Sequence, residues 1–241
     1  VNFTFFVFIN FCSFSQYEMH SNETPSYPEL IEILTNLSDS SDVIELFNMG
    51  SSDYGLPIYL CIVNGSRDSL STFKKARKET TILFNNAIHP GEPDGINAML
   101  IWLKEISVNP EILVKLPVIA FIPAYNVGGM MNRSGHSRAN QNGPLEYGFR
   151  GNAQNLDLNR DFIKMDSKNA FTFTRIFHAI DPDIFVDNHV SNGADYQYTL
   201  TYIANLEDRM SPSIKKITHE SLLPNLKKAL KTNYQIDLFP Y

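Results

Sequence analysis

The chain has 241 residues, of which 43% are hydrophobic and 19% charged, and its formal net charge is −6 at pH 7. This composition is typical of a globular protein with a sizeable core, in one large domain or one domain with an extension. The negative charge argues against nucleic acid as a partner, because phosphate binding relies on clustered Lys and Arg. The one basic run, Phe73–Glu79, is interpreted as a solvated face.

The first sixteen residues differ from the rest of the chain. They are nearly all apolar or aromatic up to Ser13, and the run is shorter than the ~20 residues that cross a bilayer. Residues 1–16 resemble the apolar region of a secretory signal; the alternative is an N-terminal strand. A basic start and an initiator Met are missing, so we expect the sequence to begin within the signal. This interpretation predicts a secreted or periplasmic protein without a membrane span.

The two cysteines, Cys12 and Cys61, do not form a disulfide framework. Cys12 belongs to the signal-like segment. Cys61 lies in an apolar run, which indicates a buried core thiol.

Regular elements are predicted from about residue 28 onward. Residues 17–42 indicate a polar extended segment and then a first helix, with apolar side chains at helical spacing between Leu30 and Leu37. The elements predicted next are two strands within 43–63, a strand at 80–87, a helix at 94–106 capped by Asp94, a buried strand at 117–124, a helix at 169–180 and a buried strand at 182–190. Buried strands that alternate with helices predict an α/β fold, with three α/β/α layers around a mixed, largely parallel central sheet.

His89 and Glu92 stand in a short turn, His-Pro-Gly-Glu, directly after a predicted strand. Zinc binds imidazole nitrogen and carboxylate oxygen, and a catalytic zinc site uses three protein ligands. Taken alone, the pair leaves two alternatives open. Glu92 can simply favour the N-terminus of the next helix, and His89 can be a loop histidine.

A third ligand is available at the end of another predicted strand, where His189 lies. The carboxyl ends of strands in open α/β sheets are where ligand sites gather. The other histidines are weaker candidates by context; they are His20, His136, His178 and His219.

The long segment 126–161 is rich in Gly and Asn, and long loops of this kind are usually functional. Its end, Phe149–Phe162, holds two arginines, amides and Asp157. Arg suits bidentate recognition of a carboxylate, and a carboxylate such as Asp157 commonly supports a metal-bound histidine. The alternative is a polar surface loop.

The motifs HPGE, RGNAQNLDLNRDF and DNHVSNGADYQY, in this order, resemble those of the zinc metallocarboxypeptidase family. The middle motif is similar to the carboxypeptidase N/E-type version, and the whole is similar to bacterial secreted members. The strand-like GLPIYLCIV also resembles the strand before the family's zinc loop. The resemblance covers about residues 43–200, and the ordered combination is far more specific than any one motif.

The resemblance implies a metal centre with one Zn²⁺. Three residues match the family's ligands: His89, Glu92 and His189. Asp157 matches the aspartate that supports the first zinc histidine.

The resemblance also implies a substrate site for peptides with a free C-terminal carboxylate. Arg150 matches the arginine that polarises the scissile carbonyl. Asn159 and Arg160 match the pair that binds the terminal carboxylate.

One departure from the family concerns the general base. The family's glutamate base, and a tyrosine that closes over substrate, lie well beyond the last zinc histidine, and here the chain stops at Tyr241. Neither Glu207 nor Glu220 stands in a matching context. We therefore expect a catalytic domain over 43–241 that is truncated at the C-terminus and has little or no peptidase activity. A smaller departure is Asn155, where many relatives carry glycine.

The function expected from the resemblance is a zinc-dependent metallocarboxypeptidase, which hydrolyses the C-terminal peptide bond with a zinc-activated water. The first alternative is a related zinc deacylase acting on N-acyl amino acids. The second is a catalytically inactive binding module that keeps the zinc pocket.

Overall fold

The computed structural model describes residues 22–65, 69–138, 140, 141, 143–191, 193, 194 and 196–241. The predicted signal-like segment 1–16 lies outside these residues. The chain divides into two compact units, one up to Val190 and one from Ser191 to Tyr241. Within the described part of the chain, every helix is too short or too polar to serve as a membrane span.

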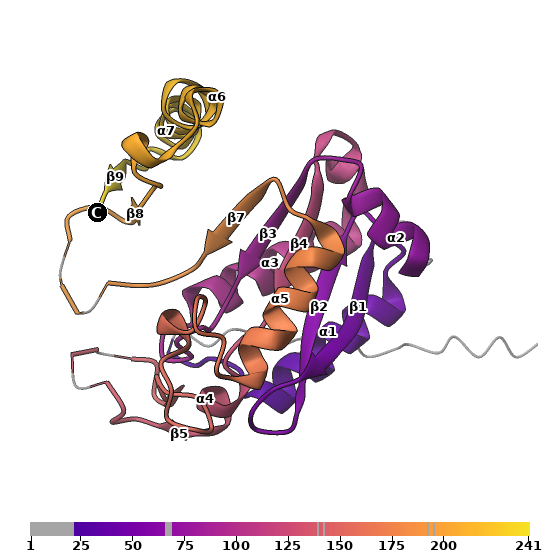
Figure 1. Cartoon of the computed structure of the whole chain (residues 1–241), viewed down its shortest axis with the longest axis vertical. Helices are drawn as coiled ribbons and strands as arrows, with labels where there is room; N and C mark the ends of the chain where they lie inside the picture. The colour runs from indigo at the N-terminus through magenta and orange to yellow at the C-terminus, as the bar shows by residue number, and fades with distance from the viewer. Residues whose placement is uncertain (1–21, 66–68, 139, 142, 192, 195) are drawn as a thin grey trace, which may run out of the picture. The chain divides into compact units, whose positions relative to one another are not determined.

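The first unit is built on a five-stranded sheet in the order β1-β2-β4-β3-β7 (Figure 1). Its strands are β1 (Ile44–Ser51), β2 (Pro57–Val63), β3 (Thr81–Asn85), β4 (Val118–Ile122) and β7 (Ile184–Asp187). The β1–β2 and β2–β4 pairs are antiparallel, whereas β3 pairs with β4 and with β7 in parallel. The prediction of an α/β fold with a mixed sheet is confirmed, and the parallel half comprises β4, β3 and β7.

Helices cover both faces of this sheet. They are α1 (Tyr27–Ser40), α2 (Ser69–Ala76), α3 (Asp94–Val108) and α5 (Lys168–Ile180), and the 3₁₀ segment η1 (Pro110–Lys115) follows α3. Helix α1 contacts α3, and α2 contacts α5; Figure 1 shows α5 in front of the sheet and α3 behind it. The three predicted layers are therefore present.

The core lies between these layers, where alternating strand residues meet the apolar stripes of the helices. Leu83 of β3 and Ala120 of β4 are paired in register and fully buried, and Leu100 and Leu103 of α3 are buried as well. Cys61 of β2 is a free, buried thiol, as predicted.

The predicted functional loop, 126–161, is only lightly structured. It contains α4 (Val127–Met131), the two-residue strands β5 (Arg133–Ser134) and β6 (Tyr147–Gly148), and the 3₁₀ turn η2 (Leu158–Arg160). The β5–β6 pair is antiparallel. Among the described residues of the loop, Nε2 of Gln141 donates to the carbonyl of Gly91 at 2.7 Å, and the Arg138 N–H donates to the hydroxyl of Tyr147 at 3.2 Å.

Three details differ from the predictions. The strand β7 is not buried: it is an edge strand paired only with β3 within the described sheet, and Phe185 is 38% exposed. Asp94 is not a cap, because Pro93 occupies that position and Asp94 is the first helical residue, where a carboxylate favours the positive helix end. The basic run includes the end of α2, whose Phe73 packs its ring 5.1 Å from that of Phe47.

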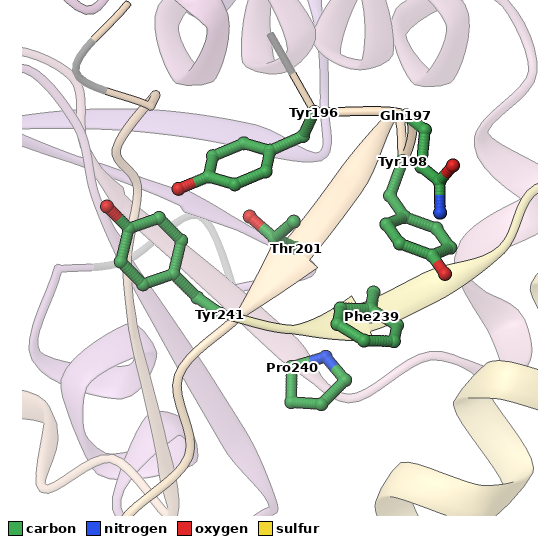
Figure 2. A pocket seen from close by; sticks show the side chains of 7 residues that line it. All are labelled: Tyr196, Gln197, Tyr198, Thr201, Phe239, Pro240 and Tyr241. Carbon is green, nitrogen blue, oxygen red and sulfur yellow. The ribbon is translucent and has the colours of Figure 1, made fainter. Parts of the chain in front are cut away.

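The second unit is small and mainly helical. It contains β8 (Leu200–Tyr202), η3 (Glu207–Arg209), α6 (Pro212–Lys215), the π-helical segment η4 (Lys216–Leu222), α7 (Leu223–Tyr234) and β9 (Leu238–Pro240). Strands β8 and β9 pair in parallel. A cavity of about 440 Å³ beside them is lined by aromatic rings (Figure 2), including Tyr198 stacked on Phe239 at 4.2 Å between centroids.

Candidate metal centre

The turn that carries His89 and Glu92 follows the buried strand β3. At Ala87 the backbone adopts a left-handed conformation with φ of 55°, which turns the chain sharply after the strand. The N–H of Glu92 then donates to the carbonyl of His89 at 2.9 Å, which closes a tight turn. His89 and Glu92 are only 2% and 3% exposed, so two ionisable groups are held inside the molecule at this corner.

Three side chains converge at this turn. Nδ1 of His89 lies 3.1 Å from Oε1 of Glu92, and Nδ1 of His189 lies 2.9 Å from Oε2 of the same carboxylate. One ligand atom from each of the three residues can be chosen so that all lie within 4.8 Å of one another. His189 reaches the group because it follows β7, the parallel neighbour of β3.

Each imidazole also contacts an aspartate through its other ring nitrogen. Nε2 of His89 lies 3.1 Å from Oδ1 of Asp157, and Nε2 of His189 lies 3.0 Å from Oδ2 of Asp187. In both rings Nδ1 therefore faces Glu92 and Nε2 faces an aspartate. Carboxylates in this position fix the orientation of metal-binding histidines.

The donor set fits zinc. Two imidazole nitrogens and one carboxylate are the ligands of many catalytic zinc sites, which leave a fourth position for water or substrate. Nδ1 of His89 and Nδ1 of His189 lie 3.1 and 2.9 Å from the two oxygens of Glu92, so one carboxylate contacts both of the imidazole nitrogens that would bind the ion.

The pKa values of Glu92 and His189 show that this cluster of side chains favours positive charge. Burial opposes ionisation of Glu92, but hydrogen bonds from His189, His89 and Arg138 outweigh it and hold the pKa of the carboxyl well below its usual range. Hydrogen bonds to Asp187 and Glu92 raise the pKa of His189 to about 9. The carboxylates that attract a proton here would also attract a divalent cation.

Arg150 lies at the edge of this group. Its Nε and Nη2 donate to Oδ2 of Asp157 at 3.1 and 2.9 Å, and its Nη1 lies 3.3 Å from Nδ1 of His89. The backbone is fixed too, because Nδ2 of Asn126 donates to the carbonyl of Arg150 at 2.9 Å. The Arg150 side chain remains 40% exposed, so a fixed guanidinium faces solvent beside the three donors.

Asn159 and Arg160 lie on η2, one turn beyond Asp157. The Asn159 N–H donates to Oδ1 of Asp157 at 3.0 Å, so the aspartate that contacts His89 also shapes this turn. Nη1 of Arg160 donates to the carbonyl of Asn159 at 2.8 Å and the side chain is exposed. The structure therefore brings together His89, Glu92, His189, Arg150 and Asp157, and it places Asn159 and Arg160 on the adjoining turn.

Of the weaker candidates, His136 and His178 belong to the described part of the first unit and do not join this group. His20 lies outside the described residues, and His136 and His178 are exposed. His219 belongs to the second unit, where its Nδ1 lies 3.5 Å from Glu207.

Two residues at the centre were not identified from the sequence. Asp187 is the last residue of β7 and stands two positions before His189, so the alternation of the extended chain was a signal that could have found it. Arg138, whose Nη1 lies 2.6 Å from Oε1 of Glu92, comes from a loop position without any spacing relation to the motifs.

Comparison with known families identifies the class of protein. The sequence matches the zinc carboxypeptidase family over residues 30–185, which is well over half of the chain. The protein therefore belongs to the zinc carboxypeptidase family. The match includes His89 and Glu92 and ends shortly before His189. A search of curated proteins found no match.

Solved structures agree in fold. The metallo-carboxypeptidase from Burkholderia cenocepacia gives a TM-score of 0.64 at 16% identity, covering 90% of this chain and 53% of its own. The metallo-carboxypeptidase from Pseudomonas aeruginosa in complex with (2-guanidinoethylmercapto)succinic acid gives 0.60 at 16% identity, covering 86% and 48%. Bovine thrombin-activatable fibrinolysis inhibitor in complex with tick carboxypeptidase inhibitor gives 0.64 at 14% identity, covering 90% and 76%. The chain thus spans about half the length of these two bacterial structures.

Proposed function

We propose that the protein is a zinc-dependent metallocarboxypeptidase, which hydrolyses the C-terminal peptide bond of peptides with a free terminal carboxylate. The observation that carries this proposal is the convergence of His89, Glu92 and His189 on one point, beside the guanidinium of Arg150. Family membership supports the same chemistry.

His89, Glu92 and His189 would hold one zinc ion. When bound at such a site, zinc lowers the pKa of its water and polarises a carbonyl oxygen. Asp157 and Asp187 would keep the two imidazoles in the orientation that presents Nδ1.

Arg150 would stabilise the oxyanion that develops on the scissile carbonyl. Its guanidinium is held by Asp157, so the donor does not need to reorganise when charge develops, which is what makes such donors effective. Asp157 thereby serves both His89 and Arg150 through its two oxygens.

Asn159 and Arg160 would bind the terminal carboxylate of the substrate. Arg offers parallel N–H groups that match a carboxylate, and Asn offers an amide donor. Their position on the turn next to Arg150 supports a carboxylate site close to the reacting carbonyl.

Metal analysis tests the metal centre. The purified chain is expected to contain about one zinc per molecule. Replacing His189 by Ala should weaken zinc binding strongly, whereas His178→Ala, which removes an exposed histidine of α5, should leave it unchanged. Equal zinc affinity in His189→Ala and in the wild type would remove His189 from the ligand set.

Turnover by protein expressed from the complete gene tests the reaction. An N-blocked dipeptide with a free C-terminus should be cleaved at the peptide bond, and the same dipeptide with a C-terminal amide should not. Faster hydrolysis of N-acyl amino acids than of the blocked dipeptide would instead favour a deacylase.

The proposal includes export. Its support is the apolar character of residues 1–16. N-terminal sequencing of exported protein is expected to show a mature chain that lacks this segment, and a chain still beginning at Val1 would contradict it.

A further inference from the structure

The side chain of Arg138 is buried against the proposed metal centre. Its Nη1 donates to Oε1 of Glu92 at 2.6 Å, and the guanidinium and carboxylate side chains are 8% and 2% exposed. The same oxygen faces Nδ1 of His89 at 3.1 Å. Arg138 therefore contacts a proposed ligand directly and has no role in the function described above.

The backbone of Arg138 is anchored by a buried tyrosine. The hydroxyl of Tyr147 accepts from the Arg138 N–H at 3.2 Å and lies 3.0 Å from the Arg138 carbonyl oxygen, to which it can donate. Tyr147 itself is buried, so the backbone at residue 138 is anchored from within the molecule.

Gly91, between the two proposed ligands of the turn, makes room for the side chain. A Cβ at Gly91 would lie 2.6 Å from Cδ of Arg138 and 3.1 Å from the carbonyl oxygen of Gly148. Any residue with a side chain at this position would collide with the stem of the arginine.

The carboxylate of Glu92 is held by donors on both oxygens. Arg138 contacts Oε1, while Oε2 accepts from the Val190 N–H at 3.2 Å and faces Nδ1 of His189. A carboxylate bonded in this way cannot rotate about its last torsion without breaking a buried charged hydrogen bond, and such bonds are strong.

We propose that Arg138 is a positioning residue of the zinc centre, which fixes the carboxylate of Glu92 in the orientation that binds the metal. The inference rests on the proposed zinc site and adds a residue to it. Its physical basis is that groups bonded to metal ligands set ligand orientation and thereby metal affinity.

The test measures zinc affinity by competition with a chelator, together with the visible spectrum of the cobalt-substituted protein. Arg138→Met, which keeps an unbranched apolar stem and removes the donors, is expected to bind zinc about 10–100-fold more weakly and to change the cobalt spectrum. Arg138→Lys, which keeps a charge near Glu92, should recover part of the loss.

A matched control separates the carboxylate contact from anchoring of the loop. Arg133 of the same loop donates to the carbonyls of Thr24, Pro25 and Glu146. Arg133→Met therefore removes an anchoring arginine that does not contact Glu92, and it should leave zinc affinity and the cobalt spectrum unchanged.

Gly91→Ala provides a second variant that leaves Arg138 chemically intact. It should displace the arginine and weaken zinc binding in the wild type, but have a much smaller effect in an Arg138→Ala background, because the clash with the arginine is then gone. This variant tests whether Arg138 positions Glu92 even if Arg138→Met does not fold.

The outcomes distinguish the two proposals. A wild-type chain that binds no zinc would overturn the metal centre itself. A wild type that binds zinc, with Arg138→Met or Gly91→Ala equal to it in affinity and spectrum, would overturn the role of Arg138 and leave the zinc site standing. An equal loss in Arg133→Met would also count against Arg138, because it would assign the effect to the loop.

Discussion

Nε2 of His189 lies 3.0 Å from Oδ2 of Asp187, and only Asn188 separates the two residues in the chain. Asp187 ends β7 and His189 follows two positions later, and the two side chains meet just beyond the strand. The other oxygen of Asp187 accepts from Nδ2 of the buried Asn85 on the neighbouring strand at 2.9 Å. The orientation of His189 is thereby linked to the buried part of the sheet.

Replacing Asp187 by Ala is expected to weaken zinc binding about 10–100-fold, because the imidazole of His189 loses the partner that orients it. Chelator competition measures the change.

Asp166→Asn provides the control, because that carboxylate is 57% exposed and pairs with Lys164 at the surface. An Asp187→Ala protein that binds zinc as tightly as the Asp166→Asn protein would show that Asp187 has no part in the metal centre.

Asp161 anchors the start of α5. Its Oδ2 accepts from the N–H and hydroxyl of Ser167, and its Oδ1 accepts from the Asp166 N–H. Burial opposes ionisation, but these hydrogen bonds outweigh it and hold the pKa of Asp161 below its usual range. Asp161→Asn should lower the free energy of unfolding by about 2–3 kcal/mol at pH 7, measured by urea unfolding.

The pH dependence of this contribution has a definite sign. Because the folded-state pKa of Asp161 is depressed, its stabilisation is fully present above the unfolded pKa of about 4 and is lost as pH falls through the folded value. The difference between wild type and Asp161→Asn should therefore shrink below pH 4. A difference that stays constant down to pH 2 would contradict the assignment.

Tyr125 carries a buried hydroxyl that has no hydrogen-bond partner among the described residues. An unpaired buried polar group costs about 1–3 kcal/mol, so Tyr125→Phe should leave the unfolding free energy unchanged or raise it by about 1 kcal/mol. Tyr147→Phe is the matched control: it removes the partner of the Arg138 N–H and should destabilise by about 1–3 kcal/mol. Thermal unfolding of both variants gives the comparison, and a destabilised Tyr125→Phe would show that the hydroxyl is satisfied.

Cys61 should resist thiol reagents in the folded protein. Burial in β2 raises the pKa of the Cys61 thiol to about 12, which leaves roughly one molecule in 10⁴ as the reactive thiolate at pH 8. Labelling of a Cys12→Ser chain should be slow in buffer and complete in denaturant. Rapid labelling in buffer would place Cys61 at an accessible position.

The hydrophobic pattern was sufficient to predict the sheet and its main helices. Strands such as Thr81–Asn85 and Val118–Ile122 are apolar on both faces because helices cover both. The pattern did not predict α2, because the Lys residues beside Phe73 obscure the single apolar side of that short helix. It also did not show that β7 is an edge strand, since strand order depends on long-range pairing.

The candidate centre was predictable only in part. The turn with His89 and Glu92 has a local signal, whereas the pairing of His189 with the same carboxylate depends on β7 lying beside β3. Arg138 has no local signal at all, because its contact with Glu92 joins residues 46 positions apart. Contacts of this kind follow from loop closure, which residue type and spacing do not encode.

The position of β7 at the edge of the described sheet has a consequence for motion. His89 and Glu92 belong to a buried turn, but His189 follows a strand that is hydrogen-bonded on one side only, and edge elements open at lower free energy than the core. A metal bound by all three residues would connect the peripheral strand to the interior. Its binding free energy would then appear as slower amide hydrogen exchange over Ile184–Asp187.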